Sequence, residues 1–212
     1  MSYPHERQIE YWTSRAIEEY FENQGYTVVV IPNSQHLEKV IPFDHLFAGA
    51  GIKVFGLQYK RLYPQPDHWR LERHQHGTLL HFDWTYYALT EVRTISEHRN
   101  ALHLVEIVRP ARMPNSCLPN LRLDSMGSGQ GKFPYMRWGG FVQGLFACHA
   151  GRMVTSLAEI QDLLGSATDL ADALVDIYLV TTGPKRVMVR SSPFVRSVGE
   201  EEMLELGLEE LG

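Results

Sequence analysis

The sequence predicts an α/β fold with a mixed central sheet flanked by helices. A helical pattern over residues 5–24 is followed by a strand-like run at 26–32, and further strand-like runs follow at 40–48 and 53–63. The chain has 212 residues, of which 44% are hydrophobic and 21% charged, as is typical of a chain that buries a core. This length fits one domain.

The first element is an amphipathic helix over residues 5–24. Its apolar residues recur at three- and four-residue spacing, which favours a helix with one buried face; they are Ile9, Trp12, Ala16, Ile17, Tyr20 and Phe21. Gly25 is a suitable residue to end the helix. Glu10 and Glu18 lie on a ridge beside the apolar stripe.

Three strands are expected next. Residues 26–32 are rich in β-branched residues and end at Pro32. The second strand, 40–48, carries Asp44, and the third, 53–63, carries Gln58 and Lys60. A short hairpin through residues 49–51 would place the second strand beside the third.

The later elements are less regular. Residues 68–83 fit either a hairpin that turns at Gly77 or a short helix with a loop. We expect helices at 85–96 and 141–149 and a strand at 101–108. Ser156 and Glu159 form a capping-box pattern that begins another helix, Thr168 or Asp169 begins a further short one, and 176–182 and 185–190 read as strands.

The domain organisation follows from these elements. We expect one domain over 1–198, with a core at 7–110 and a C-terminal extension at 111–198, followed by an acidic helical segment at 199–212. Residues 111–140 are rich in Pro, Gly, Asn and Ser and predict a long surface excursion. Its arginines alternate with aromatic residues, which suits either nucleic-acid contacts or a plain surface loop.

Composition excludes several classes of protein. No run approaches the roughly 18 apolar residues of a membrane helix, and the N-terminal residues lack the apolar segment of a signal peptide. The two cysteines, Cys117 and Cys148, form no metal-ligand pair and no disulfide framework. The net charge of -5 argues against strong non-specific DNA affinity of the whole surface. We therefore expect a cytoplasmic protein that makes no membrane contact.

Polar residues converge at the end of the third strand. Side chains alternate between the two faces of a strand, so Gln58 and Lys60 share a face and lie roughly 6–7 Å apart. A hairpin neighbour carrying Asp44 would add a carboxylate to this amide and ammonium. The sequence therefore predicts one polar site built from three side chains.

This pattern resembles the restriction-endonuclease-like superfamily of PD-(D/E)XK nucleases. The motif reads Pro42-Phe43-Asp44 and then Gln58-Tyr59-Lys60, and the glutamine is similar to the Mrr-like branch, where Gln-x-Lys stands for Glu-x-Lys. The resemblance covers about residues 7–63. It implies a restriction-endonuclease-like fold and a nuclease that hydrolyses phosphodiester bonds, with DNA expected in preference to RNA, within a defence or repair complex or as a homodimer.

The resemblance also implies roles for individual residues. Asp44 would be the main ligand of Mg²⁺ or Mn²⁺, with the Gln58 amide oxygen and the Tyr59 backbone carbonyl as further ligands. Lys60 would orient the attacking water or stabilise the developing anion. Such nucleases often take an acid from the first helix, for which Glu18 is the candidate and Glu10 the reserve. Gln58 in place of an acid leaves the site one negative charge short.

Other interpretations stay open. Without a second acid, the chain is alternatively a catalytically inactive nuclease-like module that binds a protein or nucleic-acid partner. The same letters also suit an ordinary half-exposed strand, with Asp44 in a turn. A weaker alternative is a metal enzyme built on the histidine-rich stretch 68–83, in which a solvated hairpin is the simpler interpretation.

Overall fold

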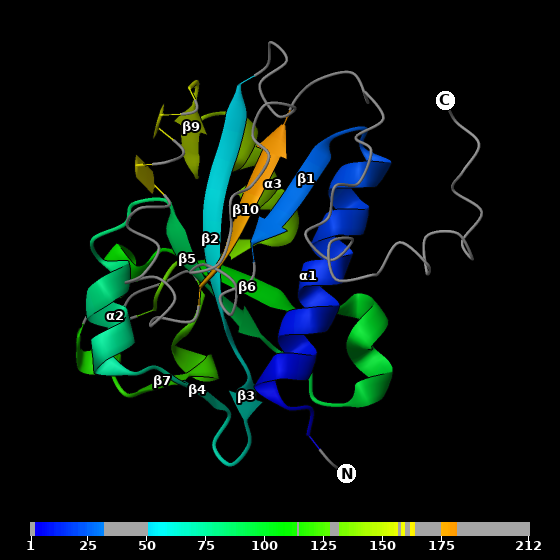
Figure 1. The fold of residues 1–212 in the computed structure, drawn as a ribbon. Coiled ribbons are helices and arrows are strands. Elements are labelled where there is room, and N and C mark those ends of the chain that lie inside the picture. Colours follow the sequence, from blue (N-terminus) through cyan, green and yellow to red (C-terminus); the bar gives the residue numbers. More distant parts are fainter. Residues whose placement is uncertain are drawn as a thin grey trace, which may run out of the picture.

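A seven-stranded mixed sheet forms the centre of the molecule (Figure 1). We describe it from a computed structural model, which describes residues 3–31, 51–113, 115–127, 132–156, 158–159, 162–163 and 175–181. The strand order is β1-β10-β2-β5-β6-β8, and β9 pairs with one end of β2. Strands β2 and β5 are parallel, and the other neighbouring pairs are antiparallel. The α/β class with a mixed sheet is therefore confirmed.

The elements run in the following order. They are α1 (Glu6–Asn23), β1 (Thr27–Ile31), β2 (Ile52–Lys60), β3 (Leu62–Tyr63), β4 (His68–Arg70), α2 (Arg73–Leu79), β5 (Thr85–Thr90), η3 (Ile95–Asn100), β6 (Val105–Val108), η4 (Pro110–Arg112), η5 (Asn115–Cys117), β7 (Asn120–Arg122), η6 (Leu123–Ser125), β8 (Met136–Arg137), α3 (Trp138–Phe146), β9 (Arg152–Val154) and β10 (Val175–Thr181). Here η denotes a 3-10 helix.

Helix α1 forms where its apolar stripe predicts. Ile9, Ile17 and Phe21 are fully buried, and Gly25 follows the helix with a φ of +83°, which glycine adopts without strain. The helix packs on one face of the sheet together with α3, which is expected at 141–149 and found at Trp138–Phe146. In Figure 1, α1 lies along the right of the sheet and α3 lies behind it.

Strand β2 is buried along its whole length, because both of its faces are covered. Phe55, Leu57 and Tyr59 point to the face covered by α1 and α3. Gln58 and Lys60 point to the other face, where α2 lies. The predicted alternation along this strand is therefore confirmed.

The neighbour of β2 differs from the prediction. Strand β10 pairs with β2 from Ile52 to Gln58 and separates it from β1. The opposite edge of β2 pairs with β9 and then with β5. A hairpin neighbour at 40–48 was expected because adjacent strands in sequence usually pair, but a strand from much later in the chain takes this place. Residues 40–48, with Asp44, lie outside the described residues.

Two expectations between residues 85 and 108 need correction. Residues 85–90 form strand β5 instead of the first half of a helix. This strand lies between β2 and β6 in the sheet, and both of its faces are buried, so its apolar run does not alternate with polar residues. Residues 95–100 form the 3-10 helix η3. The strand expected at 101–108 is shorter, from Val105 to Val108.

The histidine-rich stretch takes the helical alternative. Residues 68–70 form β4 and residues 73–79 form α2, with Gly77 inside the helix. Strand β4 also joins β3 and β7 in a small three-stranded sheet, so part of the expected surface excursion is ordered against it.

Some of the remaining predictions are confirmed, and others concern residues that the structure does not describe. The strand at 176–182 is found as β10, and the hydroxyl of Ser156 accepts a hydrogen bond from the Glu159 amide, as the capping box predicts. The start of a helix at Thr168 or Asp169, the strand at 185–190 and the acidic segment 199–212 lie outside the described residues. Within the described part of the chain, no helix has the length and apolar character needed to span a bilayer.

Candidate functional site

Gln58 and Lys60 meet the same partner at the end of β2. The Oε1 atom of Gln75, on α2, lies 2.6 Å from the Gln58 amide nitrogen and 3.1 Å from the Lys60 ammonium. All three residues are 5% exposed or less, so these hydrogen bonds are shielded from water. The pair that the alternation predicts is thus brought together, and a residue of α2 joins it.

The donor and acceptor chemistry fixes the orientation of both amides. An ammonium only donates, so the Gln75 atom beside Lys60 is its amide oxygen. An amide oxygen only accepts, so the Gln58 atom beside it is the amide nitrogen. The Gln58 amide oxygen is therefore directed away from Gln75. That oxygen is the atom a hard metal ion would bind.

An acid from the first turn of α1 completes the contacts of Lys60. The carboxylate of Glu6 lies 3.6 Å from the Lys60 ammonium. The next residue, Arg61, donates a hydrogen bond of 3.4 Å to the carbonyl of Pro4, just before α1. These contacts tie the start of α1 to the end of β2. The Lys60 backbone carbonyl accepts a hydrogen bond from the hydroxyl of Thr90 on β5.

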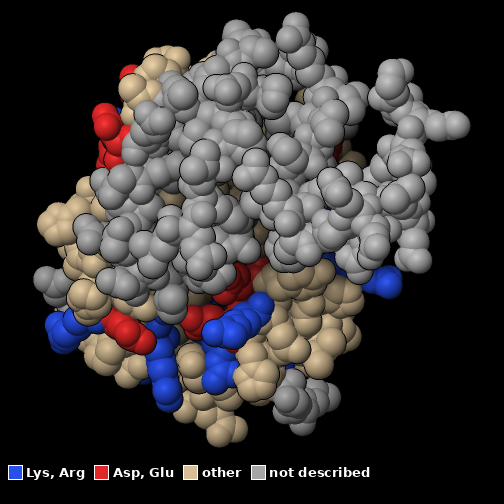
Figure 2. Space-filling model, viewed as in Figure 1, with Lys and Arg blue, Asp and Glu red and all other residues tan. Residues whose placement is uncertain are grey.

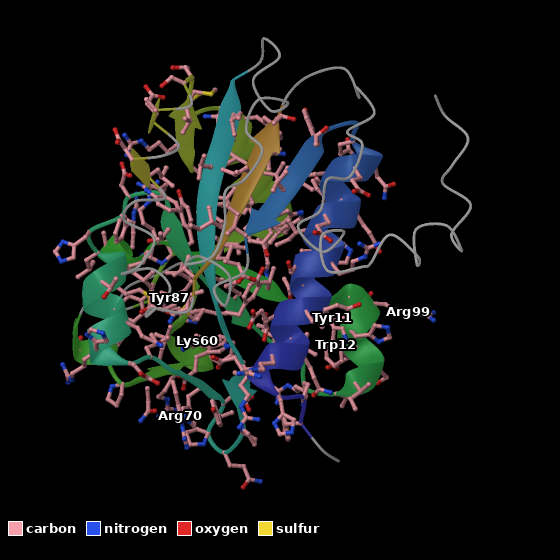
Figure 3. All side chains as sticks on the ribbon, in the orientation of Figure 1. Tyr11, Trp12, Lys60, Arg70, Tyr87 and Arg99 are labelled. Carbon is pink, nitrogen blue, oxygen red and sulfur yellow. The ribbon has the colours of Figure 1, made fainter. Side chains whose placement is uncertain are left out.

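His76 on α2 and Tyr87 on β5 are two buried, uncharged aromatic residues near Gln58. Their rings are nearly parallel, with centroids 6.0 Å apart, and the Nδ1 atom of His76 lies 3.2 Å from the Tyr87 hydroxyl. Burial lowers the pKa of His76 from its ordinary value of 6.5, and burial also raises the pKa of Tyr87. Both rings are therefore uncharged at pH 7. In Figure 3 the labels of Tyr87, Lys60 and Arg70 follow one another from top to bottom, left of the centre of the view.

Helix α1 presents three of its acids at different heights. Glu6 contacts Lys60, and Glu10 lies one turn further on, where burial first and the charge of Glu6 second raise its pKa. Glu18 is twelve residues beyond Glu6, roughly 18 Å along the helix axis. Its carboxylate pairs with Arg15 at 3.3 Å. The structure therefore brings Glu6 to Lys60, whereas Glu18, the acid named from the sequence, pairs with Arg15.

The opposite face of β2 carries its own polar contact. The hydroxyls of Tyr59 and Tyr178 form a buried hydrogen bond beneath α1. Burial raises the pKa of both hydroxyls well above the ordinary value, and the charge of Asp176 acts in the same direction. The Tyr59 side chain thus belongs to the core under α1, while its backbone lies one residue beyond the last pair of β2 with β10.

The donor set suits a hard divalent cation in kind. Gln58 offers an amide oxygen, Tyr59 a backbone carbonyl and Glu6 a carboxylate, all oxygen ligands of the type Mg²⁺ takes. Among the residues that the structure describes, no group of three or more His, Cys, Asp or Glu side chains is placed to hold a metal. Asp44, the expected main ligand, lies outside them.

Sequence reasoning missed three residues of this region, Glu6, Gln75 and His76. Glu6 stands at the first position of α1, and its relation to Lys60 depends on how the helix crosses the sheet. Gln75 and His76 lie in the histidine-rich stretch, whose polar residues also fit a solvated hairpin. Their burial becomes visible only once this stretch forms α2.

Comparison of the chain with protein-family models, with curated proteins and with solved structures gave no match.

Proposed function

We propose that this chain is a Mg²⁺- or Mn²⁺-dependent nuclease of restriction-endonuclease-like type that hydrolyses phosphodiester bonds, with DNA as the expected substrate. The observation that carries the proposal is the shared contact of Gln58 and Lys60 at the end of β2. The crossover from β2 through α2 to the parallel strand β5 supports it, because α2 then covers the face that carries these side chains.

Lys60 has the environment that its proposed role requires. Its ammonium is buried, held between the Gln75 oxygen and the Glu6 carboxylate, so its position is restricted. A fixed ammonium at this point would orient the attacking water and stabilise negative charge on the phosphoryl oxygens as it develops. Glu6 is our candidate for the acid of the first helix, with Glu10 one turn away.

Gln58 and Tyr59 would supply neutral oxygen ligands, and Asp44 would supply the main carboxylate. A bound divalent cation would activate water and offset charge on the transition state. Gln58 contributes no charge to this set, so binding of the cation would depend strongly on Asp44. Cation affinity is expected to be weaker than in a site with two or three carboxylates.

The test is cleavage of supercoiled plasmid and linear DNA with Mg²⁺ or Mn²⁺. Wild type is compared with Asp44→Ala, Lys60→Met and Glu6→Gln, and Glu18→Gln is the matched control on the same helix. We expect Asp44→Ala, Lys60→Met and Glu6→Gln each to reduce the cleavage rate by at least about 100-fold with an unchanged circular dichroism spectrum. Glu18→Gln should retain activity. Equal activity of wild type and Lys60→Met would refute the proposal.

The second candidate is a catalytically inactive module of the same shape that binds a nucleic-acid or protein partner. It is favoured by the internal pairing of Lys60, whose ammonium already contacts two groups of the chain. Wild-type inactivity on DNA and RNA with either cation would favour this candidate. Sedimentation of the full chain would then show whether it also forms homodimers.

A further inference from the structure

The small sheet of β3, β4 and β7 has two contrasting faces. Leu62, Trp69 and Leu121 are aligned across its three strands and are all at most 1% exposed. Side chains alternate along a strand, so the residues next to these three on each strand point to the opposite, outer face. With Arg61, which directly precedes β3, this outer face consists of Arg61, Tyr63, His68, Arg70, Asn120 and Arg122. It carries three arginines and no acid.

Tyr63 is the centre of the outer face. The guanidinium carbon of Arg61 lies 4.1 Å from the centroid of its ring, and that of Arg70 lies 4.4 Å from it. The ring of His68 stacks at 5.6 Å. Two long cationic side chains are thus held by one aromatic ring, which reduces the entropy they would lose on binding a ligand.

The ion pairs found among the described residues involve neither Arg61 nor Arg70. The described ion pairs of nearby arginines are those of Arg122 with Asp124 and of Arg93 with Asp67. Arg61 donates to a backbone carbonyl instead, and Arg70 is exposed. The outer face therefore presents positive charge although the whole chain carries -5.

The outer face adjoins the candidate active site. Arg61 is the residue after Lys60, and β3 begins directly after it. Figure 3 places Arg70 below Lys60, and Figure 2 shows several blue side chains in the lower part of the same view, where β3 and β4 lie, with red acidic side chains beside and above them. A polyanion bound on this face would therefore pass the end of β2, where Lys60 lies.

We propose that the outer face of β3, β4 and β7 binds the phosphate backbone of the nucleic-acid substrate, an inference that rests on the proposed function. Guanidinium groups match phosphate oxygens with paired N–H donors. Because arginines already pack on the ring of Tyr63, backbone contact is favoured over stacking of bases on it. Binding should therefore depend on salt and little on base sequence.

The test separates binding from cleavage. Fluorescence anisotropy of a labelled 20-base-pair duplex, in EDTA and over a series of salt concentrations, compares wild type with Arg70→Glu. Arg99→Glu is the matched control, because Arg99 is exposed on η3 and Figure 3 shows it on the far side of α1 from Arg70. Both variants change the net charge equally. Tyr63→Leu is the second variant, which removes the ring that holds the arginines.

For Arg70→Glu we expect affinity to fall about tenfold or more beyond the change in Arg99→Glu, and the salt slope to fall by about 1. Tyr63→Leu should weaken binding with a smaller change of slope. Equal affinities of Arg70→Glu and Arg99→Glu, or no binding by wild type at low salt, would overturn the inference. If wild type cleaves DNA but Arg70→Glu and Arg99→Glu bind the duplex equally well, only the binding role of this surface is refuted. If binding depends on Arg70 but wild type cleaves no DNA, only the nuclease proposal is refuted.

Discussion

The Lys60 ammonium and the Gln75 amide oxygen lie 3.1 Å apart, and the same oxygen accepts a hydrogen bond from Gln58. One acceptor on α2 therefore holds both polar side chains of the Gln-x-Lys motif. This arrangement leads to a direct prediction about Gln75.

Replacing Gln75 with leucine should destabilise the protein. The change leaves two buried donors without their common acceptor, at a cost of about 1–3 kcal/mol for each unsatisfied group. Gln75→Glu is the control, because a carboxylate accepts both bonds and attracts Lys60. Urea denaturation measures the free energy of unfolding of both variants. Equal loss in the two would show that the acceptor is unimportant.

Replacing Gln58 with glutamate should make folding depend on divalent cations. A carboxylate oxygen would face the Gln75 oxygen at the present 2.6 Å contact, so Gln75 would have to turn its oxygen away from Lys60. Mg²⁺ would relieve this repulsion by binding the new carboxylate. We therefore expect Mg²⁺ to raise the Tm of Gln58→Glu more than that of wild type. Gln143→Glu, at an exposed position of α3, controls for charge, and an equal Mg²⁺ response in all three proteins would contradict the prediction.

Glu106 should make stability depend on pH. Burial, and next the charge of Glu91, raise its pKa from 4.5 to about 7, while Arg137 opposes this. The protonated form is favoured in the folded state, so its stabilisation is full below about pH 4.5 and is lost as the pH rises through about 7.

Glu106→Gln removes this titration. Relative to that variant, wild type should lose unfolding free energy between pH 5 and 7, by at most about 1.4 kcal/mol per pH unit. Glu97→Gln is the control, because hydrogen bonds from the amides of Arg93 and Thr94 lower the pKa of Glu97. Its own stabilisation is lost only below pH 4.5. Parallel stability curves of wild type and Glu106→Gln would disprove the assignment.

A methyl group at Gly56 should weaken the sheet at β2. A Cβ there would lie 2.7 Å from Cγ1 of Val175 on β10 and 3.1 Å from Cγ2 of Thr85 on β5. Gly56→Ala should therefore cost about 1–3 kcal/mol as overpacking. Gly139→Ala is the control, because a Cβ at Gly139 meets no atom within 4 Å. Similar denaturation midpoints for the two variants would exclude this strain.

Local pattern predicted much of the first half of the fold. The stripe of α1, the strand at β1 and the alternation along β2 each depend on neighbouring residues, so the sequence alone contains them. The run Thr85–Thr90 was misassigned because a strand buried on both faces loses its alternation and looks like a helix in a short window.

The partners of β2 could not be predicted in the same way. Tyr59 and Tyr178 form a hydrogen bond although they are 119 residues apart, and no local pattern encodes such a pairing. The acid that contacts Lys60 could not be chosen from the sequence for a related reason. Several glutamates lie on α1, and the way in which the helix crosses β2 brings Glu6 to Lys60.

The position of β10 between β1 and β2 also has a consequence for synthesis. Strands β1 and β2 leave the ribosome early, yet the strand that pairs with both is made only when residue 181 has been added. Until then the nascent chain holds two strand edges without their final partner, which favours binding of chaperones or aggregation. Val175 pairs with Gln58, so the strand that carries Gln58 and Lys60 would gain its last neighbour only at that moment.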